Sequence, residues 1–303
     1  MTFQLYDKSG SIENLGNNDT AVTIGVFDGV HLGHKALVEQ LSTIDKSLSP
    51  LVVTLTSHPS YVLGRRSSEY WLDDPDEHLR LLFKAGAKHV AVLPFTQEVA
   101  QMSACQMARL LYDKIQMRSL LLGYDSRFGS KSNDDFERLP QLAADLGFTI
   151  HRGEPFLVDG DPISSSRIRT SLANGTVEET TALLGHPYSI SGIVHHGRGV
   201  GHTLGFPTAN VDLSHTRKML PADGVYIVSM ADHIGMANLG AAPTFAIDKP
   251  TLEVHLLDYQ GDLYGISAEV QFLHRLRQTK HFNTIDALQK QLQHDLEQVR
   301  RWS

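Results

Sequence analysis

The sequence predicts an α/β domain built on a parallel sheet, followed by a small antiparallel β-barrel domain that ends in a helix. Its 303 residues are enough for two domains. In the first part of the chain, short apolar runs alternate with longer stretches of helical spacing, whereas later apolar runs are separated only by turns. The change occurs near Gly185-His186-Pro187, so we expect domains of residues 1–185 and 186–303.

The first domain is expected to contain parallel strands covered by helices. Its strands are predicted from apolar runs at residues 21–27, 51–55, 89–93 and 119–122. Its helices are predicted from apolar residues three to four apart at about 34–42, 75–84, 103–115 and 134–146. In sheets of this kind ligands bind at the carboxyl ends of the strands, so motifs that directly follow a strand matter most.

The second domain is expected to be a closed antiparallel barrel. Its strands are predicted at residues 188–194, 225–230, 234–239, 252–258 and 266–272. Gly and Pro residues separate these runs, and closure into a barrel removes exposed strand edges. The last stretch, residues 283–300, places Ile285, Leu288, Leu292 and Leu296 at spacings of three and four, which predicts a terminal helix.

The composition restricts the class of function. Asp and Glu number 34 against 27 Lys and Arg, and the net charge of −7 argues against a protein that binds nucleic acid over a broad surface. The sequence has no run of 18 apolar residues that would predict a membrane span, and its single cysteine, Cys105, suits a reducing compartment. We therefore expect a cytoplasmic protein with small-molecule substrates and no nucleic-acid or membrane partner, either monomeric or weakly homo-oligomeric.

A glycine-rich segment follows the first predicted strand and leads into a helix. It reads Gly25-Val26-Phe27-Asp28-Gly29-Val30-His31-Leu32-Gly33-His34. Glycine lets the backbone approach a polyphosphate, and a helix N-terminus offers unpaired N–H groups and a partial positive charge. His31 and His34 are three residues apart and face the same way, so both can donate to the oxygens of a leaving phosphate group. A zinc site is the alternative, although no carboxylate or thiol completes a ligand set.

In the second domain, Thr208 and Asn210 stand two residues apart in the turn-forming segment 201–210. If this part of the chain is extended, the two side chains point the same way. A hydroxyl and an amide supply neutral oxygen ligands that suit Mg²⁺ beside the phosphates of ATP. A purely structural turn is the alternative.

These two segments resemble the motifs of one family. The segment 25–34 is similar to the phosphate-binding motif of nucleotidyltransferases, in the form found in bacterial bifunctional riboflavin kinase/FAD synthetases. Pro207-Thr208-Ala209-Asn210 resembles the signature of riboflavin kinases, and segments 220–226, 238–245 and 252–258 agree with that family in order and spacing. The resemblance covers about residues 23–299 and implies a Rossmann-like nucleotidyltransferase domain followed by a riboflavin kinase barrel.

For the first domain, the resemblance implies residues that bind ATP, act on pyrophosphate and place the flavin. ATP and phosphate contacts are expected from Gly25, Phe27, Asp28, Gly33, Ser164, Ser165 and Arg167, catalysis from His31 and His34, and flavin contacts from His58 and Asp125. For Ser164 and Ser165, helix capping is the alternative. Ser57 stands where proline is usual and Ser126 where an aromatic residue is common, so the use of FMN is less firmly implied than the use of ATP.

For the second domain, the resemblance implies that Glu253 is the base that accepts the proton of the substrate hydroxyl. A solvated strand glutamate is the alternative. Gly205 and Thr208 are expected to bind ATP, Thr208 and Asn210 to bind Mg²⁺, and Arg277 to bind the flavin. His202 and Ala242 replace arginines that are frequent in the family.

The implied function is the synthesis of FAD in two ATP-dependent steps. Riboflavin is phosphorylated to FMN with ATP and Mg²⁺, and AMP from a second ATP is then transferred to FMN with release of pyrophosphate. One alternative is a riboflavin kinase with a weakened or altered adenylyltransferase domain. The other is a flavin-binding regulator that has lost turnover.

Overall fold

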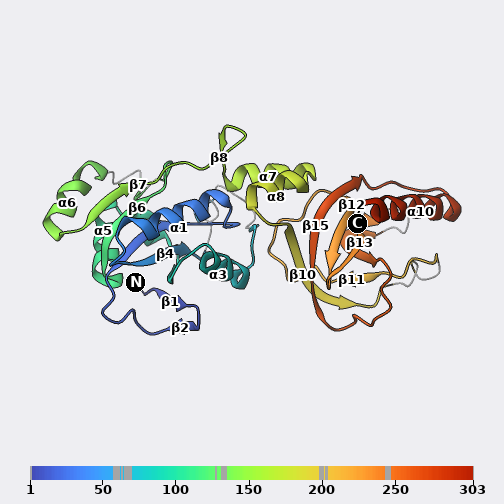
Figure 1. Cartoon of the computed structure of the whole chain (residues 1–303), viewed down its shortest axis with the longest axis horizontal. Coiled ribbons are helices and arrows are strands. Elements are labelled where there is room, and N and C mark those ends of the chain that lie inside the picture. Colours follow the sequence, from blue (N-terminus) through green and yellow to red (C-terminus); the bar gives the residue numbers. More distant parts are fainter. Residues whose placement is uncertain are drawn as a thin grey trace. The chain divides into compact units, whose positions relative to one another are not determined.

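The computed structural model describes residues 2–56, 62, 64, 70–126, 128–130, 135–197, 201, 204–242 and 247–302 (Figure 1). Contacts divide the chain into two compact units, residues 1–164 and 165–303. Helices α7 (Ser165–Asn174) and α8 (Val177–Leu184) therefore belong to the second unit. The predicted boundary falls at Gly185, the left-handed residue that ends α8. In the described part of the chain, no helix has the length and apolar character needed to cross a membrane.

The first unit contains a seven-stranded sheet in the order β2-β1-β5-β4-β3-β6-β7. Its strands are β1 (Gln4–Asp7), β2 (Gly10–Ile12), β3 (Thr20–Gly25), β4 (Ser49–Leu55), β5 (His89–Leu93), β6 (Met117–Leu122) and β7 (Thr149–Arg152). Strands β3 to β7 pair in parallel, which confirms the predicted α/β class. The antiparallel strands β1 and β2 were not predicted, because they are short and carry mostly polar or half-exposed residues.

Helices cover both faces of this sheet because its central strands are apolar on both sides. The helices of the unit are α1 (Leu32–Ile44), α3 (Pro75–Lys84), α4 (Gln97–Gln101), α5 (Ala104–Ile115) and α6 (Leu139–Leu146). In β4, Leu51 and Val53 pack in the cluster that contains α5 and α6, whereas Val52 packs with α1 and α3. The loop after β3 therefore leads into a helix on the face that also carries α3. Two short strands, β8 (Leu157–Val158) and β9 (Asp161–Pro162), complete the unit.

The second unit is a closed barrel in the order β10-β11-β14-β13-β12-β15. Its strands are β10 (Tyr188–His195), β11 (Ala209–Val211), β12 (Gly224–Met230), β13 (His233–Ala242), β14 (Ile247–Leu256) and β15 (Ser267–Arg277). All pairs are antiparallel, and β10 pairs with β15 to close the ring, which confirms the predicted barrel. The terminal helix α10 (Ile285–Trp302) packs on the barrel through Leu292, Leu296 and Val299.

Candidate functional site

The turn between β3 and α1 has an unusual backbone. Phe27, Gly29 and Val30 have positive φ angles of 53°, 81° and 35°. Left-handed conformations at residues other than glycine cost on the order of 1–3 kcal/mol and persist only where surrounding contacts enforce them. The turn is closed by a 2.9 Å hydrogen bond from the Val30 N–H to the Phe27 carbonyl. Gly25 suits this place, because a methyl group there would approach the Phe27 ring to 3.1 Å and the ring would have to shift slightly.

His31 ends this turn and caps α1. Its side chain is buried, and its Nδ1 accepts a hydrogen bond of 3.3 Å from the His34 N–H. Burial lowers the pKa of His31 to about 4, with the charge of Asp73 opposing the shift and that of Lys35 adding to it. His31 is therefore neutral at pH 7. Because Nδ1 is an acceptor, the single ring proton must lie on Nε2, which leaves an N–H group to donate to a ligand.

The ring of His34 lies flat against that of His31. The two centroids are 3.6 Å apart with an interplanar angle of 18°, and the Phe27 and His34 rings meet edge to face with their centroids 5.1 Å apart. Burial, followed by the charges of His31 and His78, holds the pKa of His34 well below its usual value. Gly33 makes this arrangement possible, because a methyl group there would lie 3.2 Å from the His31 ring. The structure thus brings the two predicted histidines together as a pair of neutral rings at the start of a helix.

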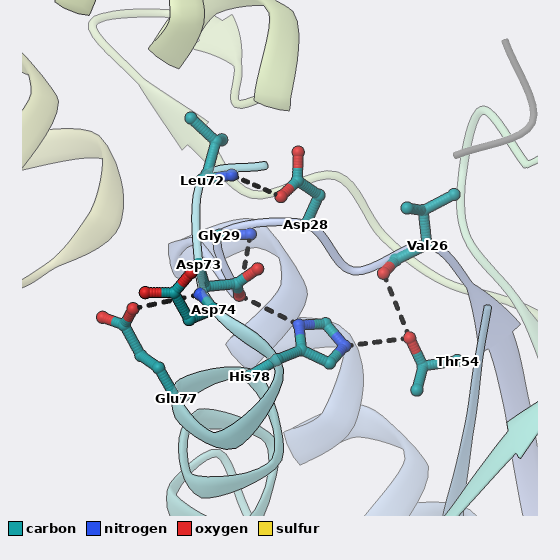
Figure 2. Close-up of polar contacts among 9 residues, drawn as sticks. All are labelled: Val26, Asp28, Gly29, Thr54, Leu72, Asp73, Asp74, Glu77 and His78. Atoms are coloured by element: carbon teal, nitrogen blue, oxygen red, sulfur yellow. Dashed lines mark hydrogen bonds and ion pairs between the residues drawn. The ribbon is translucent and has the colours of Figure 1, made fainter. Parts of the chain in front are cut away.

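Other residues predicted for the first domain have more varied surroundings. The Asp28 carboxylate is buried and accepts a 2.7 Å hydrogen bond from the Leu72 N–H, so it shapes the turn (Figure 2). Asp125 is exposed and follows β6, the parallel neighbour of β3, so the two loops leave the same edge of the sheet. His58 lies outside the described residues.

The predicted second phosphate motif lies at the start of α7. Ser164 precedes this helix and Ser165 is its first residue; both are half-buried. The Arg167 Nε lies 3.6 Å from Glu179 Oε1 on α8. An ion pair as exposed as this one contributes little to stability, and a phosphate would give Arg167 a charge-assisted, bidentate partner.

The predicted kinase residues meet on neighbouring barrel strands. Glu253 of β14 is the register partner of Asn210 on β11 and of Asn238 on β13. Side chains directly opposite in antiparallel strands lie on one face of the sheet, with Cβ atoms about 4.5–5.5 Å apart. Three polar side chains therefore form a row, Asn210–Glu253–Asn238, on three adjacent strands. Sequence reasoning had not singled out Asn238, whose place in the row depends on strand register.

A pocket of about 110 Å³ opens next to Thr208. Val254, Leu256, Tyr259 and Tyr264 are among the residues that line it, so apolar and aromatic residues stand beside a hydroxyl-bearing one. Such a lining suits a flat heteroaromatic ring.

Two glycines leave room for the predicted metal ligands. A methyl group at Gly197 would stand 2.2 Å from the Asn210 amide nitrogen, and one at Gly201 would stand 3.1 Å from the Thr208 hydroxyl. Gly197 was not recognised from the sequence, because its contact with Asn210 is made across the β10–β11 pair. Gly205 adopts a φ of 86°, which a glycine accepts without strain.

The structure gives Arg277 partners within the protein. Its Nε and Nη2 atoms donate to Asp295 of α10 at 3.0 and 2.7 Å, and Nη1 donates to the Gln278 carbonyl at 3.0 Å. The carboxylate of Asp295 is buried, so this pair fastens α10 to the end of β15. These bonds use three of the five guanidinium N–H groups, so the predicted flavin contact of Arg277 stays a prediction.

Comparisons with known proteins identify a family for each half of the chain. A model of the FAD synthetase family matches residues 14–167, and a model of the riboflavin kinase family matches residues 184–303. A bifunctional riboflavin kinase/FMN adenylyltransferase of Escherichia coli strain K12 is 36% identical over 282 residues, which cover 90% of both chains. A protein of the same description from Bacillus subtilis strain 168 is 33% identical over 294 residues, covering 93% of this chain and 92% of the relative.

A solved structure is similar over nearly the whole chain. It is described as a macrolide-efflux protein from Streptococcus pneumoniae, is 30% identical and superimposes with a TM-score of 0.84, covering 96% of this chain and 97% of the other. Its description names a function that differs from that of the sequence relatives, whereas its fold is the same. The family predicted from the motifs is confirmed: this chain belongs to the bifunctional riboflavin kinase/FMN adenylyltransferases.

Proposed function

We propose that the two reactions of this family are divided between the two halves of the chain. The barrel phosphorylates riboflavin to FMN with ATP, and the α/β half transfers AMP from a second ATP to FMN, giving FAD and pyrophosphate. We assign residues 1–185 to the adenylyltransferase and 186–303 to the kinase; the matched ranges 14–167 and 184–303 support this division. The net charge of −7 supports small-molecule rather than nucleic-acid partners.

The row Asn210–Glu253–Asn238 carries the kinase assignment. As the ribityl 5′-oxygen forms a bond to the γ-phosphorus of ATP, Glu253 accepts the hydroxyl proton and the bond to the β-phosphate oxygen breaks. The pocket next to Thr208 holds a ring of one of the two substrates, both of which carry a flat heteroaromatic system. The carboxylate is held by its strand on a rigid barrel, which keeps the base in place as the proton moves.

The donor set of the barrel fits Mg²⁺. The Thr208 hydroxyl and the Asn210 amide supply neutral oxygen ligands, and the missing side chains of Gly197 and Gly201 let the chain pack closely against them. When bound there, Mg²⁺ would neutralise charge on the ATP phosphates. Thr208 and Asn210 would bind the metal ion, and Glu253 would accept the proton.

The stacked pair His31 and His34 carries the adenylyltransferase assignment. A phosphate oxygen of FMN attacks the α-phosphorus of ATP, and the bond to the pyrophosphate oxygen breaks. The Nε2–H of neutral His31 and the N-terminus of α1 meet the negative charge that develops on pyrophosphate. Since both histidines have depressed pKa values, they donate as neutral rings over the physiological pH range and are not general acids.

One assay separates this proposal from its alternatives. Purified protein is incubated with riboflavin, ATP and Mg²⁺, and the products are resolved by chromatography. FAD is the expected product; accumulation of FMN alone would indicate an altered adenylyltransferase, and unchanged riboflavin would indicate a binding protein without turnover. Omission of Mg²⁺ tests the metal requirement. Light scattering tests whether the protein is a monomer or a weak homo-oligomer. We propose that the enzyme is cytoplasmic.

A further inference from the structure

A chain of hydrogen bonds supports the turn between β3 and α1 from the protein interior (Figure 2). At one end, the Thr54 hydroxyl donates to the Val26 carbonyl at 3.1 Å and lies 2.9 Å from Nε2 of His78. At the other end, Asp73 Oδ2 lies 2.9 Å from Nδ1 of His78 and accepts a 3.0 Å hydrogen bond from the Gly29 N–H. His78 therefore connects two groups that hold the two ends of the turn.

These contacts define the protonation state of His78. The Asp73 carboxylate is acceptor-only, so Nδ1 of His78 must carry a proton. The single proton of the Thr54 hydroxyl is used on the Val26 carbonyl, so Nε2 of His78 must also donate. A neutral imidazole has only one N–H group. The full set of contacts is therefore satisfied only by the imidazolium form.

The charges around His78 agree with this reading. Burial by itself disfavours the imidazolium, but Asp73 and Glu77 from its own segment and Asp28 from the turn after β3 outweigh it, and the pKa of His78 is raised. From α1 the neutral ring of His34 faces His78, and the charge of His78 helps to lower the pKa of His34. The side chains of His78 and Asp73 are only 12% and 2% exposed, so solvent screens this charge weakly.

The sequence positions His78 through a helix start. Asp74-Pro75 begins α3, with the Asp74 N–H bonded to Glu77 at 3.3 Å and the His78 N–H bonded to the Asp74 carbonyl at 2.8 Å. This first turn directs His78 back towards Asp73. Loss of the His78 proton would turn the Thr54 hydroxyl towards Nε2, and the Val26 carbonyl would lose its donor.

We propose that Asp73 and protonated His78 form a positioning unit for adenylyl transfer. By fixing Val26 and Gly29, they hold the strained turn that leads to His31 and so set where His31 Nε2 and the first N–H groups of α1 meet the phosphates of ATP. Neither residue is a catalytic residue, since both act through the turn. The proposal rests on the assignment of adenylyl transfer to the His31 site.

The protonation state is tested on the unmodified protein. Imidazole ¹⁵N shifts are recorded by NMR from pH 5 to pH 9, with His78→Gln used to identify the His78 signals. We expect both nitrogens of His78 to be protonated at pH 7 and to titrate above the usual value of 6.5. A neutral His78 ring at pH 7 would overturn the proposal without any assumption about activity.

The positioning role is tested with His78→Gln and Asp73→Asn, with His151→Gln as the matched control in the same unit. We expect kcat for FMN adenylylation to fall by roughly tenfold to 10²-fold, the effect of a small displacement of a preorganised donor, while the KM for ATP changes less. Riboflavin phosphorylation by the same samples should stay unchanged, which reports an intact second unit, while a nearly unchanged KM for ATP in adenylylation reports a folded first unit. His78→Lys, which keeps a positive charge and several donors, should recover part of the lost rate.

The pH profile separates positioning from mere structural support. In the wild-type protein, adenylylation should decline as pH rises through the raised pKa of His78, and Asp73→Asn should move this decline to lower pH. If His31→Ala loses transfer while His78→Gln keeps both rate and profile, the positioning role is wrong and the site assignment stands. If His31→Ala also keeps full adenylyl transfer, the positioning role and the assignment of the site are both wrong.

Discussion

The two sites of this chain depend on their folds in different ways. In the kinase half, Asn210, Glu253 and Asn238 stand side by side because three neighbouring strands pair in register. In the adenylyltransferase half, the turn before His31 is held by contacts with residues 44 positions further along the chain. The first arrangement follows from a regular ladder, whereas the second requires a strained turn and a separate segment that supports it.

The two sites also differ in charge. The kinase row is centred on a carboxylate on a half-buried strand face, where an ionised base can reach a hydroxyl. The other site presents two neutral imidazoles, because burial disfavours their charged form. Behind them lies His78, a buried histidine that carries a positive charge in our proposal. Substitutions should therefore affect the two reactions separately, and by different amounts.

The largest effect is expected from Glu253→Gln. The amide cannot accept the hydroxyl proton, so FMN formation should fall by roughly 10²–10⁴-fold. Conversion of supplied FMN to FAD should stay nearly intact, because that site lies in the other half of the chain. Both rates are measured by chromatography on one sample, with the exposed Glu297→Gln of α10 as the control. A loss in kinase turnover of less than about tenfold would remove Glu253 from the role of base.

A comparable test of the other half is His31→Ala or His34→Ala. Removal of one preorganised donor to developing charge costs roughly 10²-fold in rate, so adenylyl transfer should fall by about this factor while riboflavin phosphorylation continues. His151→Ala is the control. The zinc alternative makes a different prediction: stoichiometric zinc by elemental analysis, and loss of activity on chelation that Mg²⁺ does not rescue. That result would contradict the phosphate assignment.

The site residues that the sequence predicts are those that lie close together along the chain. The histidine pair, Glu253, Thr208 and Asn210 lie in contiguous motifs, and their local geometry follows from the periods of helix and strand. Asn238 and Gly197 depend on which strands pair, and Asp73 and His78 on a contact between distant segments; neither kind of information is present in a local pattern. Strands β1 and β2 were missed for a different reason. They contain only four and three residues, largely polar, and such short segments give no periodic signal of their own.

A smaller effect is expected from Asn210→Ala in the kinase half. Loss of one neutral oxygen ligand should lower kinase activity by tenfold or more at ordinary Mg²⁺ concentration and raise the Mg²⁺ concentration needed for half-maximal rate. Asn210→Asp keeps an oxygen at the same place and should retain more activity. Wild-type activity of Asn210→Ala across a Mg²⁺ titration would exclude this residue from the metal site.

The smallest effect is expected on stability, and it distinguishes the two halves by pH. His31 has a pKa of about 4 in the folded protein against 6.5 in an unfolded chain, so its contribution to stability is present above pH 6.5 and is lost as pH falls towards 4. Between pH 6.5 and 5.5 this single group should lower the free energy of unfolding by about 1 kcal/mol. His78 has the opposite sign, because its raised pKa adds stability at low pH that is lost as pH rises through that pKa.

The measurement is urea unfolding of Trp302→Phe, in which Trp71 is the remaining tryptophan and reports on the first half. Adding His31→Ala to this background should remove the extra acid loss, while His78→Gln should remove the alkaline loss; carboxylates that do not interact with these histidines contribute equally to all three proteins and cancel in the differences. If His31→Ala keeps the acid slope of its parent, His31 is not held neutral in the folded protein, and its assignment as a neutral donor falls with it.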